Sequence, residues 1–593
     1  VISGETNNTL SVASTLNTLD GHTTGTVNAG SLTTIQGALS DVLTAYASNG
    51  ITGLGNEAIT LTDTHISVTD LNTLDSYSSG SINAQNITDI TGLVSTLTEA
   101  YSSQGIIDLG TNIVVSDKVL TSSEINILNN LSTGIINTSS VTTLIGSSAS
   151  INTLYGSSID SQSTATDGVI NLGNETIILS DSTIDASSLV SISSSTSGYV
   201  FADEVATIKG STDSINDLYD LYTNISSSSL GNESITITDK VGSSSALTTL
   251  ASNTTGIIDA DSLYTIEGSL EELNSLYLDE QFIGLNNEDI TLTDFDISRT
   301  YDVSYLNTLD GYTSGTINVD LGTVEGSLAD TLTAYQSNEI SNLGSELIRL
   351  LDTTTVKASD LIALADLNSS GGMVQASDVA AVTGTAAEII AAFALEISED
   401  AVILSGPTIS FFPSVALTVN SGTATLAEAR TLDGLTTGVV TATIADTRVS
   451  DLVGSSPLLD ANGNNAFTIT IGTDDASVSA ADLNTLDGLT TVAIDAENVS
   501  TITSTGLTDI NTLYASSGFS GLGNETIEIT DELSVAEANT LDDLTIGSIV
   551  ATIGNTRVSN LLGSASLSDA NSNNAYTISI STEDAAVSAS DLN

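Results

Sequence analysis

Internal repetition constrains this chain more than any other feature of its sequence. The string Leu-Asn-Thr-Leu-Asp begins at Leu16, Leu71, Leu306 and Leu483. Looser copies begin at Ile125, Leu189, Leu247, Leu361, Ala429, Ala538 and Leu592. The ten intervals from Leu16 to Leu592 span 576 residues, a mean period of about 58. A period of this size predicts an array of small supersecondary units rather than a few unrelated globular domains.

Each common unit carries the signals of two helices and two strands. Ser or Thr followed three residues later by Asp or Glu predicts a capped helix start, at Ser67/Asp70, Thr121/Glu124, Ser479/Asp482, Ser534/Glu537 and Ser588/Asp591. A short strand follows, as at 25–28. Apolar spacings of three and four then predict a longer helix over 32–46. The last strand follows the phrase Gly-Leu-Gly-Asn-Glu and alternates apolar with polar residues, as at 59–63.

An aromatic residue closes the longer helix at a nearly fixed position. We interpret this aromatic as a plug in the core rather than as a platform for a ligand. The series consists of Tyr46, Tyr101, Tyr155, Tyr219, Tyr277, Tyr335, Phe393 and Tyr514.

These parts predict the fold class. The two helix starts of a unit resemble each other, so each unit reads as two strand–helix coils, one short and one long. Strands that alternate with helices favour parallel pairing through right-handed crossovers. We therefore predict an α/β repeat, an elongated solenoid of strand–helix coils with a parallel β-sheet. The alternative is a tandem row of small α/β or β-rich beads, which is less favoured because a 55-residue unit buries little surface alone.

The repeats divide the chain into three regions. Residues 1–397 form an array of units of about 55 residues. Residues 398–424, which contain Pro407 and Pro413, break the pattern and form an irregular boundary. Residues 425–593 alternate two repeat types, because 431–484 matches 540–593 and both lack the longer helix. The loop after the helix-ending aromatic varies in length, so we expect it to face solvent or a partner.

Composition excludes several functions. The 593 residues include 9 Lys or Arg and 73 Asp or Glu, a formal charge of −64, which excludes nucleic-acid binding. Cysteine is absent, and the two histidines, His22 and His65, do not recur between units. We therefore expect no catalysis and no required cofactor; an acid-lined cleft in one unit would indicate a polysaccharide-active enzyme instead.

The longest apolar stretch, 386–397, is too short to span a membrane. The start at Val1, without a signal peptide, and the end inside a repeat suggest a processed or excerpted part of a longer polypeptide.

Recurring Asp and Asn residues are the candidates for a metal site. The aspartate that ends the strand fits an Asx turn, and a stacked row of such carboxylates would bind Ca²⁺. The row consists of Asp63, Asp117, Asp181, Asp239, Asp294, Asp352 and Asp531. Two further segments open like Ca²⁺ loops but lack the closing Glu, so a polar turn is the simpler interpretation. They are Asp460, Asn462, Asn464 and Asp569, Asn571, Asn573.

The repeats also resemble a known class of proteins. Leu-Asn-Thr-Leu-Asp-Gly, Thr-Ala-Tyr-Ala-Ser-Asn-Gly-Ile and Gly-Leu-Gly-Asn-Glu-Ala-Ile-Thr-Leu-Thr-Asp resemble the repeats of giant acidic bacterial cell-surface proteins, notably of marine cyanobacteria. The resemblance is one of repeat style, and it implies an extracellular or cell-surface structural protein. Leu-Asn-x-Leu-Asp-Gly also occurs in phage tail-fibre repeats.

We therefore expect a structural protein of a filament, surface layer or matrix fibre, which self-associates and has surface polysaccharide as a further candidate partner. The alternative is a calcium-dependent adhesin or a tail-fibre-like binding protein.

Overall fold

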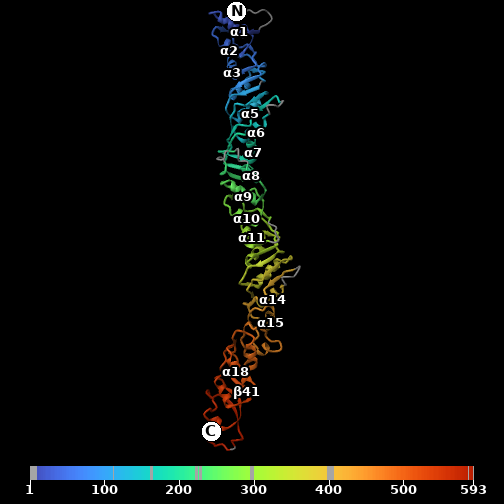
Figure 1. The fold of residues 1–593 in the computed structure, drawn as a ribbon, viewed down its shortest axis with the longest axis vertical. Helices are drawn as coiled ribbons and strands as arrows, with labels where there is room; N and C mark the ends of the chain where they lie inside the picture. Colours follow the sequence, from blue (N-terminus) through green and yellow to red (C-terminus); the bar gives the residue numbers. More distant parts are fainter. Residues whose placement is uncertain are drawn as a thin grey trace. The chain divides into compact units, whose positions relative to one another are not determined.

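A computed structural model describes residues 10–110, 112–159, 165–220, 225, 230–293, 299–396, 406–584 and 586–591. The chain divides into two compact units. Within each unit, Figure 1 shows helices and strands that follow one another in chain order. The first unit comprises residues 1–293 with 312–315, and the second comprises 294–311 with 316–593. Both are α/β repeats of solenoid type with parallel sheets, as predicted.

The first unit contains helices of eight to ten residues at regular intervals. They are α1 (Ala13–Gly21), α2 (Leu39–Ala47), α3 (Val68–Tyr77), α4 (Val94–Ser102), α5 (Ser122–Leu131), α6 (Ser148–Gly156), α7 (Ala186–Ser195), α8 (Thr212–Asp220), α9 (Ser244–Asn253) and α10 (Leu270–Tyr277). Each helix packs on the next in chain order.

Two strands follow most helices, and a third precedes every second helix. The strands are β1 (Leu10–Val12), β2 (Val27–Asn28), β3 (Thr34–Gly37), β4 (Ile51–Thr52), β5 (Ala58–Leu61), β6 (His65–Ser67), β7 (Ile82–Asn83), β8 (Asp89–Gly92), β9 (Ile106–Ile107), β10 (Asn112–Val115), β11 (Val119–Thr121), β12 (Ile135–Asn137), β13 (Thr143–Gly146), β14 (Gly168–Ile170), β15 (Thr176–Leu179), β16 (Thr183–Asp185), β17 (Val200–Phe201), β18 (Thr207–Gly210), β19 (Ser234–Ile237), β20 (Val241–Ser243), β21 (Ile258–Asp259), β22 (Thr265–Gly268), β23 (Phe282–Ile283) and β24 (Asp289–Leu292).

Parallel ladders connect one coil to the next. The sheet β6-β8-β10-β12-β14 adds one strand per coil. Its register places Ile66, Ile90, Ile113, Ile136 and Val169 in one column, and all five are buried. Burial of each such side chain contributes about 1.5–3 kcal/mol relative to exposure. The core is therefore a stack of aliphatic residues that no single coil could assemble.

A recurring glycine lets successive coils approach closely. Gly92 ends β8 beside α3, and a Cβ placed there would lie 2.1 Å from Cγ1 of Val68. In the second unit, a Cβ on Gly326 would lie 2.4 Å from Cγ2 of Val303. The glycine thus leaves room for the first side chain of the preceding coil's helix.

The second unit repeats this plan with more variation. Its helices are α11 (Val303–Asp310), α12 (Leu328–Gln336), α13 (Ala358–Leu367), α14 (Ala386–Phe393), α15 (Leu426–Leu435), α16 (Val449–Leu452), α17 (Ala480–Asp487), α18 (Leu507–Ala515), α19 (Val535–Asp542) and α20 (Val558–Leu562), with a 3-10 turn at Thr473–Asp475. Its strands are β25 (Thr300–Asp302), β26 (Ile317–Asn318), β27 (Thr323–Gly326), β28 (Ile340–Ser341), β29 (Leu347–Leu350), β30 (Thr355–Lys357), β31 (Met373–Ala376), β32 (Ala381–Gly384), β33 (Ile409–Phe411), β34 (Ala416–Val419), β35 (Val440–Thr443), β36 (Ala466–Thr468), β37 (Ser477–Ser479), β38 (Ile494–Asp495), β39 (Thr501–Ser504), β40 (Phe519–Ser520), β41 (Thr526–Leu533), β42 (Ile549–Thr556) and β43 (Ala575–Ile580).

Two local predictions were wrong. The longer helix expected over 32–46 is a strand followed by a helix, because Ile35 lies in β3 and α2 begins at Leu39. The two coils of a unit thus have helices of similar length. Ser67 makes no side-chain cap, although Thr121 with Glu124 and Ser534 with Glu537 form capping boxes.

The region expected as an irregular boundary takes part in the ladders. Within 398–424, the described residues include β33 and β34, which pair in parallel with β31 and β32. In the variant repeats, short helices of four and five residues, α16 and α20, take the place of the longer helix.

Candidate functional site

The strand-ending aspartates cap helices of the neighbouring coil. Asp63 follows β5, which pairs with β3, so its carboxylate lies beside the start of α2. The N–H of Leu39, the first residue of α2, donates to Oδ2 of Asp63 at 2.7 Å. A carboxylate at this position satisfies an N–H that the helix cannot pair and interacts favourably with the helix dipole.

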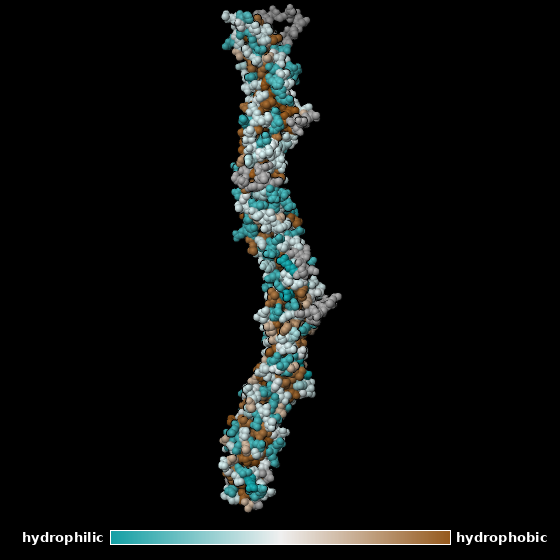
Figure 2. Space-filling view, in the orientation of Figure 1, coloured by the Kyte–Doolittle hydropathy of each residue, from teal (hydrophilic) through white to brown (hydrophobic). Residues whose placement is uncertain are grey.

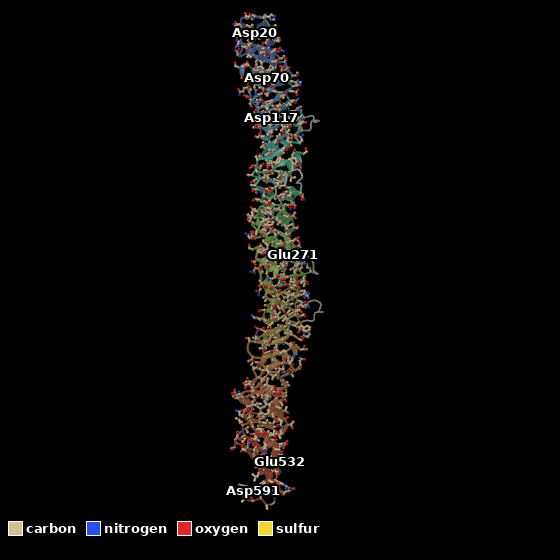
Figure 3. The ribbon with its side chains drawn as sticks, turned by 60° about the vertical axis from the view of Figure 1, so that its left-hand side comes forward. Asp20, Asp70, Asp117, Glu271, Glu532 and Asp591 are labelled. Carbon is tan, nitrogen blue, oxygen red and sulfur yellow. The ribbon has the colours of Figure 1, made fainter. Side chains whose placement is uncertain are left out.

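The same bond recurs in both units. Asp117, Asp181, Asp239 and Asp352 accept from the first N–H of α4, α6, α8 and α12, at distances of 2.6–2.8 Å. Asp294 lies outside the described residues. Asp531 lies within β41, where its own N–H donates to the carbonyl of Thr505. Figure 3 labels Asp117 of this row, together with acidic residues at other positions of the repeat, such as Asp20 and Glu271.

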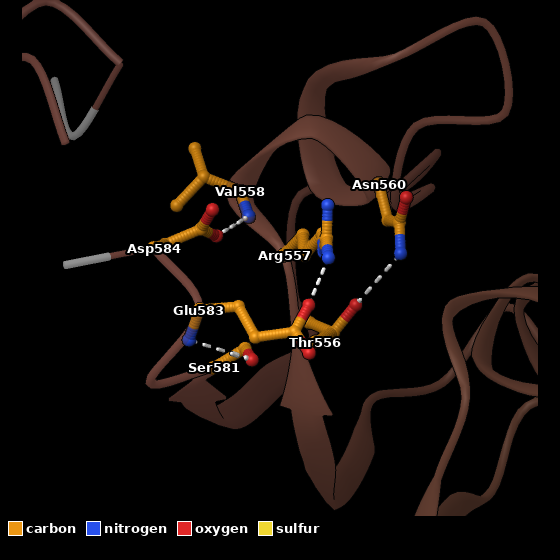
Figure 4. A network of polar contacts seen from close by, with 7 residues as sticks. All are labelled: Thr556, Arg557, Val558, Asn560, Ser581, Glu583 and Asp584. Carbon is orange, nitrogen blue, oxygen red and sulfur yellow. Dashed lines mark hydrogen bonds and ion pairs between the residues drawn. The ribbon is translucent and has the colours of Figure 1, made fainter. Parts of the chain in front are cut away.

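Sequence reasoning missed two members of this row. Asp446 accepts from the first N–H of α15 and Asp475 from that of α16, at 2.6 and 2.5 Å. Alignment of the two variant repeats could have found Asp475, because it matches Asp584, which stands 109 residues later and accepts from the first N–H of α20 at 2.7 Å (Figure 4). Asp474, the neighbouring acid, instead pairs with Arg448 at 3.4 Å.

The glutamate of Gly-Leu-Gly-Asn-Glu forms a second buried row. Glu57 is buried beneath α2, and the hydroxyl of Tyr46 donates to its Oε2 at 2.7 Å. The N–H of Gly55 donates to the same oxygen at 2.8 Å. Matching pairs, with Tyr–Glu distances of 2.6–3.1 Å, join Tyr155 to Glu175, Tyr219 to Glu233, Tyr277 to Glu288, Tyr335 to Glu346 and Tyr514 to Glu525.

Burial and the nearby carboxylate alter the titration of these tyrosines. Desolvation, the largest cause, and Glu57 together raise the pKa of Tyr46 well above its usual range. The pKa values of Tyr155, Tyr277, Tyr335 and Tyr514 are raised by burial and by their partner glutamates in the same way. The helix-ending aromatic is buried at Tyr219, Tyr335 and Phe393, as predicted, and half-buried at the other positions of the series. The bond from the tyrosine hydroxyl to the glutamate was not predicted from the sequence.

The Leu-Asn-Thr-Leu-Asp motif also joins coils. Leu71 and Leu74 are buried in the core. The side-chain amide of Asn72 donates to the carbonyl of Thr96 in the next helix at 2.9 Å. The hydroxyl of Ser103, in the turn after that helix, donates to Asp75 at 2.8 Å. The Asn and Asp of the motif thus bond to the following coil, whereas the hydroxyl of Thr73 donates to the carbonyl of Thr69 in its own helix.

The two variant repeats share a hydrogen-bonded Asp–Asn pair. The amide of Asn465 donates to Oδ1 of Asp433 at 2.7 Å, and Asn574 donates to Asp542 at the same distance. Burial acts to raise the pKa of Asp542, but hydrogen bonds from Ser568, Ala570 and Asn574 outweigh it and hold that pKa below its usual value.

The Asp-x-Asn-x-Asn segments form turns. Both carboxylate oxygens of Asp460 accept backbone N–H groups, from Asn464 and Asn465, at 3.1 Å. Asp569 accepts from the N–H groups of Asn573 and Asn574 at 3.0 and 3.2 Å. Asn462 and Asn571 lie in the exposed tips of these turns. Within the described part of the chain, no group of three or more His, Cys, Asp or Glu side chains is placed to hold a metal ion. Calcium binding stays a prediction.

The surface is mixed in character. On the face drawn in Figure 2, apolar residues are interspersed with polar ones. No helix in the described ranges is long and apolar enough to cross a membrane. Compared with protein-family models and with curated proteins, the chain matches none.

Proposed function

We propose that this chain is an extracellular structural repeat protein that forms or decorates a filament, surface layer or matrix fibre and performs no catalysis. The observation that carries the proposal is the use of its recurring polar residues. The strand-ending aspartates, and the Asn and Asp of Leu-Asn-Thr-Leu-Asp, bond to the neighbouring coil. A repeat whose motifs hold its own coils together is suited to a mechanical role.

The high negative charge of the chain supports a location outside the cell, in a medium that contains salt. A formal charge of −64 keeps an extended surface soluble, and salt screens the repulsion between carboxylates. Electron tomography of the producing cells, with gold-labelled antibodies against this chain, tests the proposal. We expect label on fibres or a layer outside the cell; label confined to the cell interior would overturn it.

The calcium-dependent adhesin is the competing proposal. Thermal melting with added CaCl₂, against MgCl₂ at equal ionic strength, separates the two. A plain scaffold gives the same melting temperature with either ion. A rise specific to calcium that is lost on Asp460→Asn with Asp569→Asn would favour the adhesin.

A further inference from the structure

A tight turn recurs in both units between the two strands that follow a helix, as between β4 and β5. The first residue of this turn has a positive φ, a backbone conformation that glycine, asparagine and aspartate adopt most readily. The series consists of Gly53, Asp108, Asn171, Gly284, Asn342 and Gly521, with φ between 60° and 89°. In these coils the chain therefore bends sharply as soon as the first of the two strands ends.

The bend brings this turn into contact with a turn of the preceding coil. A Cβ placed on Gly521 would lie 2.7 Å from the backbone nitrogen of Glu497, so the two backbones touch. Where asparagine opens the turn, its side chain makes the contact, because the amide of Asn171 donates to Oδ1 of Asn137 at 2.7 Å. The two turns are thus closed against each other at both of these places.

One coil of the second unit turns later than the others. Phe411 stands at the position of Asn342, but β33 continues through it, and its buried ring stacks on that of Phe393 with centroids 4.2 Å apart. The chain turns after Phe412 instead, where the N–H of Val415 donates to the carbonyl of Phe412 at 3.0 Å. A hollow of about 620 Å³ lies between this turn and residues 375–380 of the preceding coil.

Phe412 gives this hollow an aromatic side. The side chain of Phe412 is 54% exposed, whereas Leu343, at the same position of the preceding repeat, is half-buried. The polar side chains of the lining are those of Gln375, Ser377, Asp378 and Ser414. The volume of the hollow falls within the roughly 300–1,000 Å³ of small-ligand sites, which combine apolar or aromatic walls with a few polar groups.

The lining matches the chemistry of an uncharged sugar. A sugar ring presents C–H groups on its faces, which pack on an aromatic ring, and hydroxyls at its edges, which both donate and accept hydrogen bonds. The amide, the hydroxyls and the carboxylate of the lining offer both kinds of partner. The described lining includes Asp378 but no Lys or Arg, and the whole chain has a formal charge of −64, so an anionic sugar would be repelled.

We infer that the hollow at Phe412 binds a sugar unit of a neutral polysaccharide, with the ring of Phe412 against one face of the sugar. This inference rests on the proposed function, because it names the extracellular material that the fibre or layer holds. A single open hollow binds weakly. Each copy in a filament presents the hollow again, so attachment to a long polysaccharide strengthens with the number of copies that engage it.

Isothermal titration calorimetry of the 593-residue chain tests the site. The neutral probes are cellohexaose, maltohexaose, mannohexaose and chitohexaose, and hexagalacturonate is the anionic control. We expect at least one neutral hexasaccharide to bind with a Kd below about 1 mM, and hexagalacturonate to give no heat of binding at the same concentrations. Failure of all four neutral probes overturns the inference, and so does equal binding of hexagalacturonate.

Substitutions at Phe412 separate ring stacking from other contacts. Phe412→Leu introduces the residue of the neighbouring repeat, keeps an apolar side chain and raises the Kd at least about tenfold, whereas Phe412→Tyr keeps the ring and stays within about threefold. Tyr305→Ala, which removes an aromatic side chain of similar exposure (52%), leaves the Kd within about twofold. An unchanged Kd in Phe412→Leu, or a loss of binding in Tyr305→Ala alone, overturns the site.

The calorimetry and the antibody labelling fail independently of each other. If no neutral probe binds while the label lies on fibres or a layer outside the cell, the sugar site is wrong and the structural function stands. If a neutral probe binds through Phe412 while the label is confined to the cell interior, the structural function is wrong, and the assignment of an extracellular polysaccharide as the ligand fails with it.

Discussion

Two coils of the second unit build the same layer of the core in different ways. In one, Tyr335 and Glu346 form a buried hydrogen-bonded pair at 2.6 Å, and the N–H of Gly344 donates to the same carboxylate. In the next repeat, Phe393 takes the place of the tyrosine and stacks on Phe411 at 4.2 Å. Val415 stands where the glutamate stands, because the hydroxyl of a following Thr donates to its carbonyl as in the other coils.

The replacement extends to the donor in the loop. Pro413 occupies the position of Gly344, two residues before Val415, and proline has no N–H to donate. The acceptor and two of its donors are thus absent together. A buried carboxylate without donors is costly, and so are buried donors without an acceptor. The comparison indicates that the Tyr–Glu pair is a structural unit that is exchanged as a whole.

Alkaline pH should unfold the coils that contain Tyr–Glu pairs, and this is the largest loss of stability that we expect. Burial and the partner glutamates raise the pKa values of these tyrosines above the usual value of 10.0, so folding favours the protonated hydroxyl. This stability is fully present below pH 10 and is lost as the pH rises through the folded values. We expect tyrosinate absorbance and loss of circular dichroism to appear together. Ionisation at pH 10 with the helical signal intact would contradict the buried pairs.

Removal of a single partner should cost more than exchange of the pair. Glu346→Val leaves the donors of Tyr335, Gly344 and Ser345 without their acceptor and should lower the free energy of unfolding of the second unit by about 3 kcal/mol. Adding Tyr335→Phe should recover part of this loss, although two backbone donors stay unpaired. Urea unfolding of the double-mutant cycle measures the coupling. Glu497→Val, at an exposed glutamate, is the control; additive losses would show that the pair is not a unit.

The period, the parallel pairing and the apolar core could be predicted from the sequence, because each recurs locally in every repeat. The capping of a helix by the aspartate of a neighbouring coil could not be predicted. Asp63 and Leu39 are 24 residues apart and meet only after the strands pair. The helix over 32–46 was mispredicted for a related reason. Ile35 and Leu39 share a helical spacing, but Ile35 is held in β3 by its neighbours Ser11 and Ile59. In each case tertiary contacts outweigh the local signal.

Two helices of the chain differ in the number of side chains that cap their first turn. Helix α2 begins after Ala38 and has Asp63 as its side-chain cap, whereas α12 has both Ser327 and Asp352. Asp63→Ala should cost about 1.5 kcal/mol and Asp352→Ala about 1 kcal/mol. Amide hydrogen exchange of peptides that cover the two helix starts measures each loss. Asp63→Asn retains an acceptor and should recover most of the stability; equal losses at both helices would show that the second cap adds nothing.

The smallest effect is expected at the arginines of the variant repeats. Arg448 and Asp474 are both exposed, so their ion pair is screened by water and salt. Arg448→Ala should lower stability by about 0.5 kcal/mol or less, and less still in high salt. Asp475→Ala, one residue away, removes the cap of α16 and should cost about 1 kcal/mol. Urea unfolding at two salt concentrations measures both variants. A larger loss from Arg448→Ala would mean that charge pairing, rather than capping of the short helix, holds the variant coil to its neighbour.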